Sequence, residues 1–139
     1  MTYDESKNVP SGADAFAVSY EIQESASRQG FDWPEVSGVL DKVKEELDEV
    51  AQALKEDDQA QAQRELGDLL FASVNLARFL GTTPWECLQD ANSRFRERFL
   101  LLKTELERRD RTLDECTFEE LNLVWDEVKA RVPRNEKKA

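Results

Sequence analysis

Apolar residues recur at helical spacing along the first half of the chain. The first segment, residues 14–29, stops before Gly30, and the second, residues 36–54, carries a longer stripe. Intervals of three and four residues place side chains on one face of an α-helix, and glycine is favoured just after a helix ends. The pattern predicts two helices joined by a turn. The apolar positions are Phe16, Tyr20, Ile22, Ala26, Val36, Val39, Leu40, Val43, Leu47, Val50 and Leu54.

The second half of the chain predicts three more helices. Residues 66–80 are apolar on most sides and precede Gly81, so this helix is expected to lie centrally. Residues 83–86 (Thr-Pro-Trp-Glu) and 117–120 (Thr-Phe-Glu-Glu) have the pattern of capping boxes, which open a long fourth helix and a short fifth helix. The predicted fold is all-α, with a four-helix-bundle-like core and a short C-terminal helix.

Composition fits one helical domain. The chain has 139 residues, of which 35% are charged, with only five glycines and four prolines. A domain of this size can bury enough apolar surface to fold without disulfides. We expect a flexible segment at residues 1–13, a single helical domain at residues 14–132 and a charged tail at residues 133–139.

Charge and residue usage exclude several classes of function. The net charge of −11 disfavours a polymeric nucleic acid as partner, but a small phosphate ligand with a cation remains compatible. The absence of histidine excludes di-iron and zinc-protease motifs, and Cys87 and Cys116 form no CxxC pair. No apolar run suits a membrane, and residues 1–10 lack the pattern of a signal peptide. We expect a cytoplasmic protein.

Acidic residues on the second predicted helix have two interpretations. Glu46 and Glu49 are three residues apart, about 60° around the helix axis, and Lys42 shares their strip beside the apolar stripe. Glu45 and Asp48 are expected on the opposite, solvated face. The set of Lys42, Glu46 and Glu49 fits a ligand site and an ordinary surface ion-pair ladder about equally well.

The third predicted helix favours a site more strongly. Glu65 and Asp68 fall on its apolar face, with Asn75 near Asp68, so both carboxylates are expected to point into the bundle. Burying an unpaired carboxylate is costly, and a divalent cation would neutralise the pair. The alternative is a buried ion pair, for which Arg78 and Arg98 are the partners available.

Two acidic pairs on adjacent antiparallel helices would bring four oxygen ligands together. Such a set suits Mg²⁺, with Mn²⁺ as a substitute, and magnesium commonly recruits phosphate oxygens. Lys42 and four further residues could complete a phosphate site, although a solvated basic face explains the two arginines about as well and core packing is the simpler explanation of the tryptophan taken alone. The four are Arg94 and Arg98, four residues apart, and the pair Trp125 and Lys129.

Several segments resemble the MazG-type nucleoside triphosphate pyrophosphohydrolases of the all-α NTP pyrophosphatase superfamily. The resemblance extends over about residues 16–131, and an ExxE followed by an ExxD with the later basic segments makes it specific. The matching segments are residues 30–34 (Gly-Phe-Asp-Trp-Pro), 42–50 (Lys-Val-Lys-Glu-Glu-Leu-Asp-Glu-Val), 65–71 (Glu-Leu-Gly-Asp-Leu-Leu-Phe), 75–78 (Asn-Leu-Ala-Arg), 94–99 (Arg-Phe-Arg-Glu-Arg-Phe) and 125–129 (Trp-Asp-Glu-Val-Lys).

The resemblance implies a reaction and roles for the candidate residues. It implies Mg²⁺-dependent cleavage between the α and β phosphates of ribo- or deoxynucleoside triphosphates, which clears unwanted nucleotides and leaves a monophosphate and pyrophosphate. It also implies a homodimer or homotetramer. By the same resemblance the metal ligands are Glu46, Glu49, Glu65 and Asp68, and the substrate contacts are Lys42, Arg98, Trp125 and Lys129, with Asn75 as a weaker assignment.

The chain also departs from the family pattern. Arg94 stands where a lysine is frequent, Gln61 replaces a basic residue, and Glu21 and Ser25 interrupt a basic stretch. Such losses would narrow the substrate range or weaken phosphate binding.

Two alternatives stay open. One is a pyrophosphatase of the same superfamily that prefers a single base, such as a dUTP or dCTP pyrophosphatase, which a substrate panel would distinguish. The other is a non-catalytic helical regulator whose acidic pairs are only solvated charge, which would not be stabilised by Mg²⁺ with nucleotide.

Overall fold

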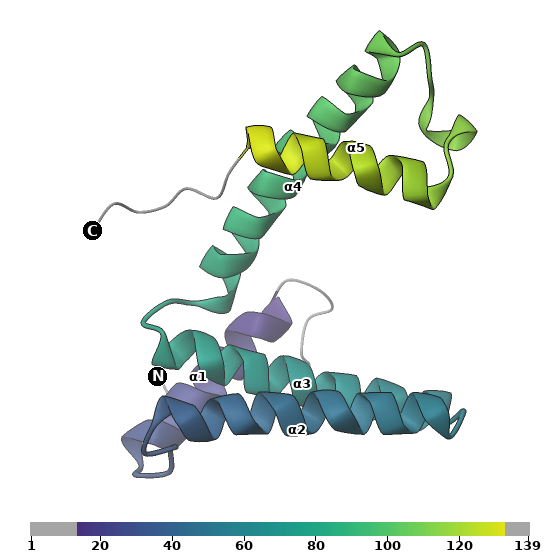
Figure 1. Cartoon of the computed structure of the whole chain (residues 1–139). Coiled ribbons are helices and arrows are strands. Elements are labelled where there is room, and N and C mark those ends of the chain that lie inside the picture. The colour runs from purple at the N-terminus through teal and green to yellow at the C-terminus, as the bar shows by residue number, and fades with distance from the viewer. Residues whose placement is uncertain (1–13, 133–139) are drawn as a thin grey trace. The chain divides into compact units, whose positions relative to one another are not determined.

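The computed structural model describes residues 14–132, and every helix and turn within that range fits the predicted all-α class (Figure 1). The expected flexible segment at residues 1–13 and charged tail at residues 133–139 lie outside the described residues. The described residues form two compact units, residues 14–87 and residues 88–132. The expectation of one domain over residues 14–132 stays a prediction.

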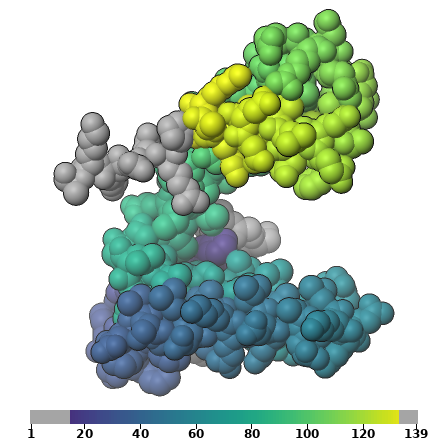
Figure 2. All heavy atoms as spheres, in the orientation of Figure 1, coloured from purple at the N-terminus to yellow at the C-terminus, as the bar shows by residue number. Residues whose placement is uncertain are grey.

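The first unit contains three helices: α1 (Asp14–Arg28), α2 (Val36–Lys55) and α3 (Gln59–Phe79). Helices α2 and α3 lie side by side along their length, and α1 also packs on α3, so α3 is central within this unit as predicted. Side chains of α2 cover much of the near face of the unit in Figure 2. The buried apolar residues of the first unit are mostly small, which lets its helices pack close together. They are Val39, Ala53, Ala62, Ala72, Val74 and Ala77.

Local signals explain where these helices end. Gly30 and Gly81 have φ angles of 93° and 73°, a left-handed conformation that glycine adopts without strain, directly after α1 and α3. The Asp58 carboxylate accepts a hydrogen bond from the Gln61 backbone nitrogen at 3.0 Å and caps the start of α3. The predicted helix stops at both glycines are therefore confirmed.

The second unit contains most of α4 (Pro84–Arg108), the short helix η1 (Leu113–Glu115) and α5 (Phe118–Arg131). Its core is a cluster of Leu102, Leu106, Val124 and Val128, with Trp125 packed against it. The predicted capping box at Thr117 is complete, since Glu120 N donates to Thr117 Oγ1 and Thr117 N donates to a Glu120 carboxylate oxygen.

The predicted box at the start of α4 is only half formed. Glu86 N donates to Thr83 Oγ1 at 3.2 Å, but the Glu86 carboxylate accepts from the Thr82 hydroxyl instead of from the backbone of Thr83. The neighbouring hydroxyl competes successfully for the carboxylate. None of the described helices is long and apolar enough to span a membrane.

Candidate functional site

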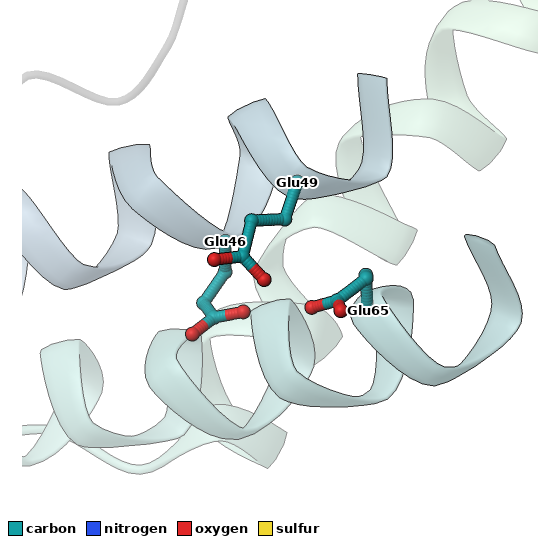
Figure 3. Close-up of side chains that lie close together, drawn as sticks. All are labelled: Glu46, Glu49 and Glu65. Atoms are coloured by element: carbon teal, nitrogen blue, oxygen red, sulfur yellow. The ribbon is translucent and has the colours of Figure 1, made fainter. Parts of the chain in front are cut away.

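Three carboxylates converge between α2 and α3. Glu46 and Glu49 project from α2 and Glu65 projects from α3, and one oxygen of each lies within 4.8 Å of the others. Figure 3 shows the three side chains pointing toward one another across the space between the helices. The spacing of three residues on α2 and the side-by-side packing of the two helices produce this convergence.

Two of the three carboxylates are buried, and each has an unpaired oxygen. Glu46 is 5% exposed and Glu65 is 8% exposed. Lys42 Nζ lies 2.9 Å from Glu46 Oε1, and Gln61 Nε2 donates to Glu65 Oε1. Among the described residues, Oε2 of Glu46 and Oε2 of Glu65 have no hydrogen-bond partner. Unpaired carboxylate oxygens in a buried place are costly, and the single ammonium group of Lys42 does not neutralise three carboxylates.

A buried glutamate in the second unit is neutralised by arginine side chains, which is the usual arrangement for a buried carboxylate. Glu105 is also only 5% exposed, but its carboxylate contacts Arg108 at 2.6 Å, Arg109 at 2.8 Å and Arg131 at 3.5 Å. Hydrogen bonds from Arg108 and Arg109 lower the pKa of Glu105 to about 2. Three cations therefore surround one carboxylate there, whereas Lys42 is the cation paired with the three-glutamate cluster in the described part of the chain.

Glu49, the exposed residue of the cluster, is affected by its acidic neighbours. The pKa of Glu49 is raised above its ordinary value, chiefly by hydrogen bonding with the Glu65 carboxyl and then by the like charge of Glu65. Three carboxylates that cannot comfortably ionise together fit a divalent cation, which accepts hard oxygen ligands and reverses the local field. The cluster therefore has the donor set that a divalent metal requires.

The interpretation of Lys42 as part of an ion-pair ladder is partly borne out. Its ammonium group contacts Glu46 and, at 3.4 Å, Glu45, and the pKa of Lys42 is raised chiefly by its hydrogen bond to Glu46. Glu45 and Asp48 are exposed, as expected for the solvated face. The ladder leaves Glu49 and Glu65 without a cation partner among the described residues, so it accounts for only part of the acidic cluster.

The expectation that both acidic residues of α3 point into the core holds for Glu65 and is wrong for Asp68. Asp68 is exposed and is not one of the three residues whose oxygens converge. A step of three residues rotates its side chain by about 60° from Glu65, which is enough to leave the α2 contact. Asp68 nevertheless lines the cavity described next, together with Lys42 and Glu46.

A cavity of about 630 Å³ adjoins this cluster inside the first unit. Its walls come from α1, from the turn at residues 31–34, and from α2 and α3. Most of the lining is apolar, including Phe31, Trp33 and Phe71, while Lys42 and Glu46 connect it to the acidic cluster. Its volume falls within the range of about 300–1,000 Å³ that is usual for small-molecule sites.

Polar side chains of the cavity include three that the sequence analysis did not assign to a site: Gln23, Asp32 and Arg78. Arg78 was considered only as an ion-pair partner for Glu65 or Asp68. Instead it donates to Glu24, Asp32 and, at 2.7 Å, Asn75 Oδ1, so that alternative is wrong for Arg78. The same bond engages Asn75, which is half-buried in the cavity wall.

The remaining candidate substrate residues lie in the second unit. Arg94 pairs with Asp90, and the Arg98 guanidinium donates to the Val132 carbonyl at 3.1 Å. Trp125 packs on the apolar core, with its ring centroid 5.4 Å from that of Phe95, and Lys129 lies 4.0 Å from Asp126. Their assignment to a substrate site stays a prediction.

Comparison with known proteins identifies similar sequences. Residues 35–98 match the MazG nucleotide pyrophosphohydrolase domain. The chain is 39% identical over 115 residues to a Thermotoga maritima protein named nucleoside triphosphate pyrophosphohydrolase/pyrophosphatase MazG. It is 39% identical over 124 residues to the Escherichia coli nucleoside triphosphate pyrophosphohydrolase, and 37% identical over 65 residues to an uncharacterized Bacillus subtilis protein, YabN.

The matches to the two pyrophosphohydrolases cover most of this chain but less than half of each of those relatives. They cover 83% and 88% of this chain, but only 44% of the Thermotoga protein and 47% of the Escherichia protein. The chain thus spans slightly less than half the length of these relatives. The YabN match covers 47% of this chain and 13% of that protein.

Proposed function

The chain belongs to the MazG nucleotide pyrophosphohydrolase family, and from that premise we propose that it hydrolyses nucleoside triphosphates to monophosphate and pyrophosphate with Mg²⁺. The observation that carries the proposal is the convergence of Glu46, Glu49 and Glu65 beside a cavity large enough for a nucleotide. The relatives named nucleoside triphosphate pyrophosphohydrolase support the same reaction class. We place the enzyme in the cytoplasm, where its substrates are.

We propose that the three converging glutamates hold the metal, with Asp68 as the fourth ligand. The unpaired Oε2 atoms of Glu46 and Glu65 supply oxygens that already lack partners, so ligation would relieve an existing penalty. Asp68 is exposed on the cavity side and free to turn toward a ligand. Magnesium, when bound, would neutralise phosphate oxygens and acidify the attacking water.

Other steps of the reaction are assigned to side chains that line the cavity or belong to the cluster. Lys42 lines the cavity next to Glu46, where its ammonium group can contact a phosphate oxygen. One of the carboxylates would accept the proton of the attacking water. The apolar walls contributed by Phe31, Trp33 and Phe71 would exclude water from the nucleoside.

The substrate residues of the second unit belong to the same proposal. Arg98, Trp125 and Lys129 are proposed to contact the triphosphate or the nucleoside, as the family resemblance implies, and Arg94 is proposed as a further phosphate contact because it lies four residues from Arg98. Arg98 offers one specific supporting feature, because its Nε is buried and has no hydrogen-bond partner in residues 14–132. A guanidinium with an unused donor is suited to a phosphate.

We further propose that the protein acts as a homodimer or homotetramer. Leucines are exposed along neighbouring faces of α2 and α3, with Leu47 at 54%, Leu54 at 60% and Leu66 at 46% exposure. Leu40, Leu47 and Leu54 repeat every seven residues, a spacing that presents one continuous apolar stripe along a helix. A second copy of the chain would remove this surface from water.

Phosphorus NMR of the products tests the reaction. The purified protein is incubated with Mg²⁺ and each ribo- and deoxynucleoside triphosphate, and the products are identified directly. We expect pyrophosphate and nucleoside monophosphate. Orthophosphate with nucleoside diphosphate would contradict the proposed bond cleavage, and the absence of turnover would support the non-catalytic regulator.

A further inference from the structure

One buried side chain of the cavity has a fixed orientation and an unused acceptor. Gln23 lies in the middle of α1, is 5% exposed, and lines the cavity. Its Nε2 donates to the Phe71 carbonyl oxygen at 2.9 Å. Because a carbonyl can only accept, the nitrogen of the Gln23 amide must face Phe71 and the oxygen must face away from it.

The Oε1 atom of Gln23 has no hydrogen-bond partner in the part of the chain that the structure describes. This is uncommon for a buried amide, and it contrasts with Arg78, whose guanidinium in the same cavity wall contacts two carboxylates and an amide oxygen. An unpaired buried acceptor is destabilising, so the fold tolerates at Gln23 a penalty that a ligand could remove.

The surroundings of Gln23 suit a flat aromatic ligand. Ile22, Phe31, Trp33 and Phe71 line the same cavity, and Lys42 and Glu46 connect it to the acidic cluster where the phosphates are proposed to bind. A nucleotide with its phosphates at that cluster would have its base among these apolar side chains. The amide of Gln23 is then available to read the polar edge of the base.

We propose that Gln23 is a specificity-determining residue, whose Oε1 accepts a hydrogen bond from the exocyclic amino group of cytosine or adenine. The proposal rests on the proposed function, since it requires a nucleotide in the cavity. The nitrogen of Gln23 is already engaged by Phe71, so the residue offers an acceptor and no free donor. The ring N–H of uracil or thymine is flanked by two carbonyl oxygens, which a lone acceptor repels.

Matched substrates test this assignment. CTP is compared with the pyrimidin-2-one ribonucleoside triphosphate, and ATP with the purine ribonucleoside triphosphate, so that each pair differs only in the amino group. For the wild-type protein we expect kcat/KM to favour the amino-bearing member of at least one pair by about tenfold. The deoxynucleotide pairs are measured in the same way.

Three variants assign the discrimination to the side chain. Gln23→Met removes the acceptor at similar volume and should bring the kcat/KM ratio close to one. In Gln23→Glu, a protonated carboxyl can donate to the Phe71 carbonyl and keep one acceptor oxygen, so the ratio should be retained. Gln29→Met alters an exposed glutamine beyond α1 and should keep the wild-type ratio.

A ratio of two substrates on one preparation is independent of the amount of folded enzyme, so a purely structural role for Gln23 would not change it. Equal kcat/KM values for both members of both pairs in the wild-type protein would overturn the inference, as would an unchanged ratio in Gln23→Met. Failure of the wild-type protein to release pyrophosphate from any nucleotide would instead overturn the proposed function.

Discussion

Arg78 joins three parts of the first unit through a single side chain. Its side chain is 6% exposed, and its guanidinium contacts Glu24 of α1 at 3.0 Å, Asp32 of the turn at 2.8 Å, and Asn75 one turn earlier on α3. Arg78, Asp32 and Asn75 line the cavity. Arg78 is therefore positioned to fix the turn that carries Phe31 and Trp33.

The same contact makes a prediction about pH. Hydrogen bonding to Arg78 lowers the pKa of Asp32 from 3.8 to about 2. Because the folded-state pKa is depressed, the stabilisation is complete above about pH 4 and is lost as the pH falls toward about 2. Asp32→Asn should lower the free energy of unfolding at pH 7 by about 1–2 kcal/mol, a value reduced for the partial exposure of the side chain.

Urea unfolding of both proteins between pH 7 and pH 2 measures this effect. The difference between wild type and Asp32→Asn should be constant from pH 7 to about pH 4 and should shrink below that. A difference that persists undiminished at pH 2 would mean that the Arg78 contact does not depend on the Asp32 charge.

Some residues of the site could be predicted from the sequence and others could not. Glu46, Glu49 and Glu65 were identified because i,i+3 spacing is local information that a helix preserves. Gln23 was missed, although it sits at a core-facing interval from Phe16 and Tyr20, which was a usable signal. The two carboxylate partners of Arg78 could not be predicted, because they lie 46 and 54 residues away in the chain.

At the scale of elements, the helices followed from periodicity and from their end signals. The predicted segments at residues 14–29 and 36–54 correspond closely to α1 and α2, since apolar spacing and terminal glycine both act locally. The short helix η1 was not predicted, because its three residues carry no periodicity. The exposure of Asp68 depended on the contact between α2 and α3, which sequence alone does not specify.

Two helical glycines differ in what surrounds them. A Cβ atom at Gly38 of α2 would lie 2.8 Å from Trp33 Cε3, whereas at Gly67 of α3 it would meet nothing within 4 Å. Gly67→Ala should therefore raise the free energy of unfolding by about 0.5–1 kcal/mol through helix propensity. Gly38→Ala must displace the Trp33 ring, and should be less stable than Gly67→Ala by about 1–3 kcal/mol.

Thermal unfolding of the two alanine variants beside the wild type provides the comparison. Gly67→Ala serves as the matched control, because it carries the same chemical change without the contact. Equal stabilisation of both proteins would show that Trp33 does not pack against Gly38 in solution, and the described wall of the cavity would then need revision.

At the scale of the whole molecule, negative charge exceeds positive charge at the proposed metal site. The chain carries a net charge of −11, yet its buried acidic cluster is paired with Lys42 alone among the described basic residues. The match to the MazG domain and this shortage of positive charge are independent observations, and both favour a divalent cation. The basic residues Arg94, Arg98 and Lys129 lie in the second unit.

At this scale, the sequence predicted the protein family through its motifs. The two acidic pairs and the later basic segments identified the family, which the match at residues 35–98 bears out. Assembly with a second copy involves contacts between chains, for which the exposed leucines of α2 and α3 are the available structural indication.

The three-glutamate cluster is the proposed centre of pyrophosphate release. The most direct test measures the rate of pyrophosphate release with Mg²⁺ for the wild type, Glu49→Gln and Asp48→Asn. Glu49 belongs to the cluster, whereas its exposed neighbour Asp48 does not, so each variant removes one carboxylate charge from the same turn of α2. We predict a loss of about 100-fold or more for Glu49→Gln and an unchanged rate for Asp48→Asn. Equal rates in the two variants would contradict the account.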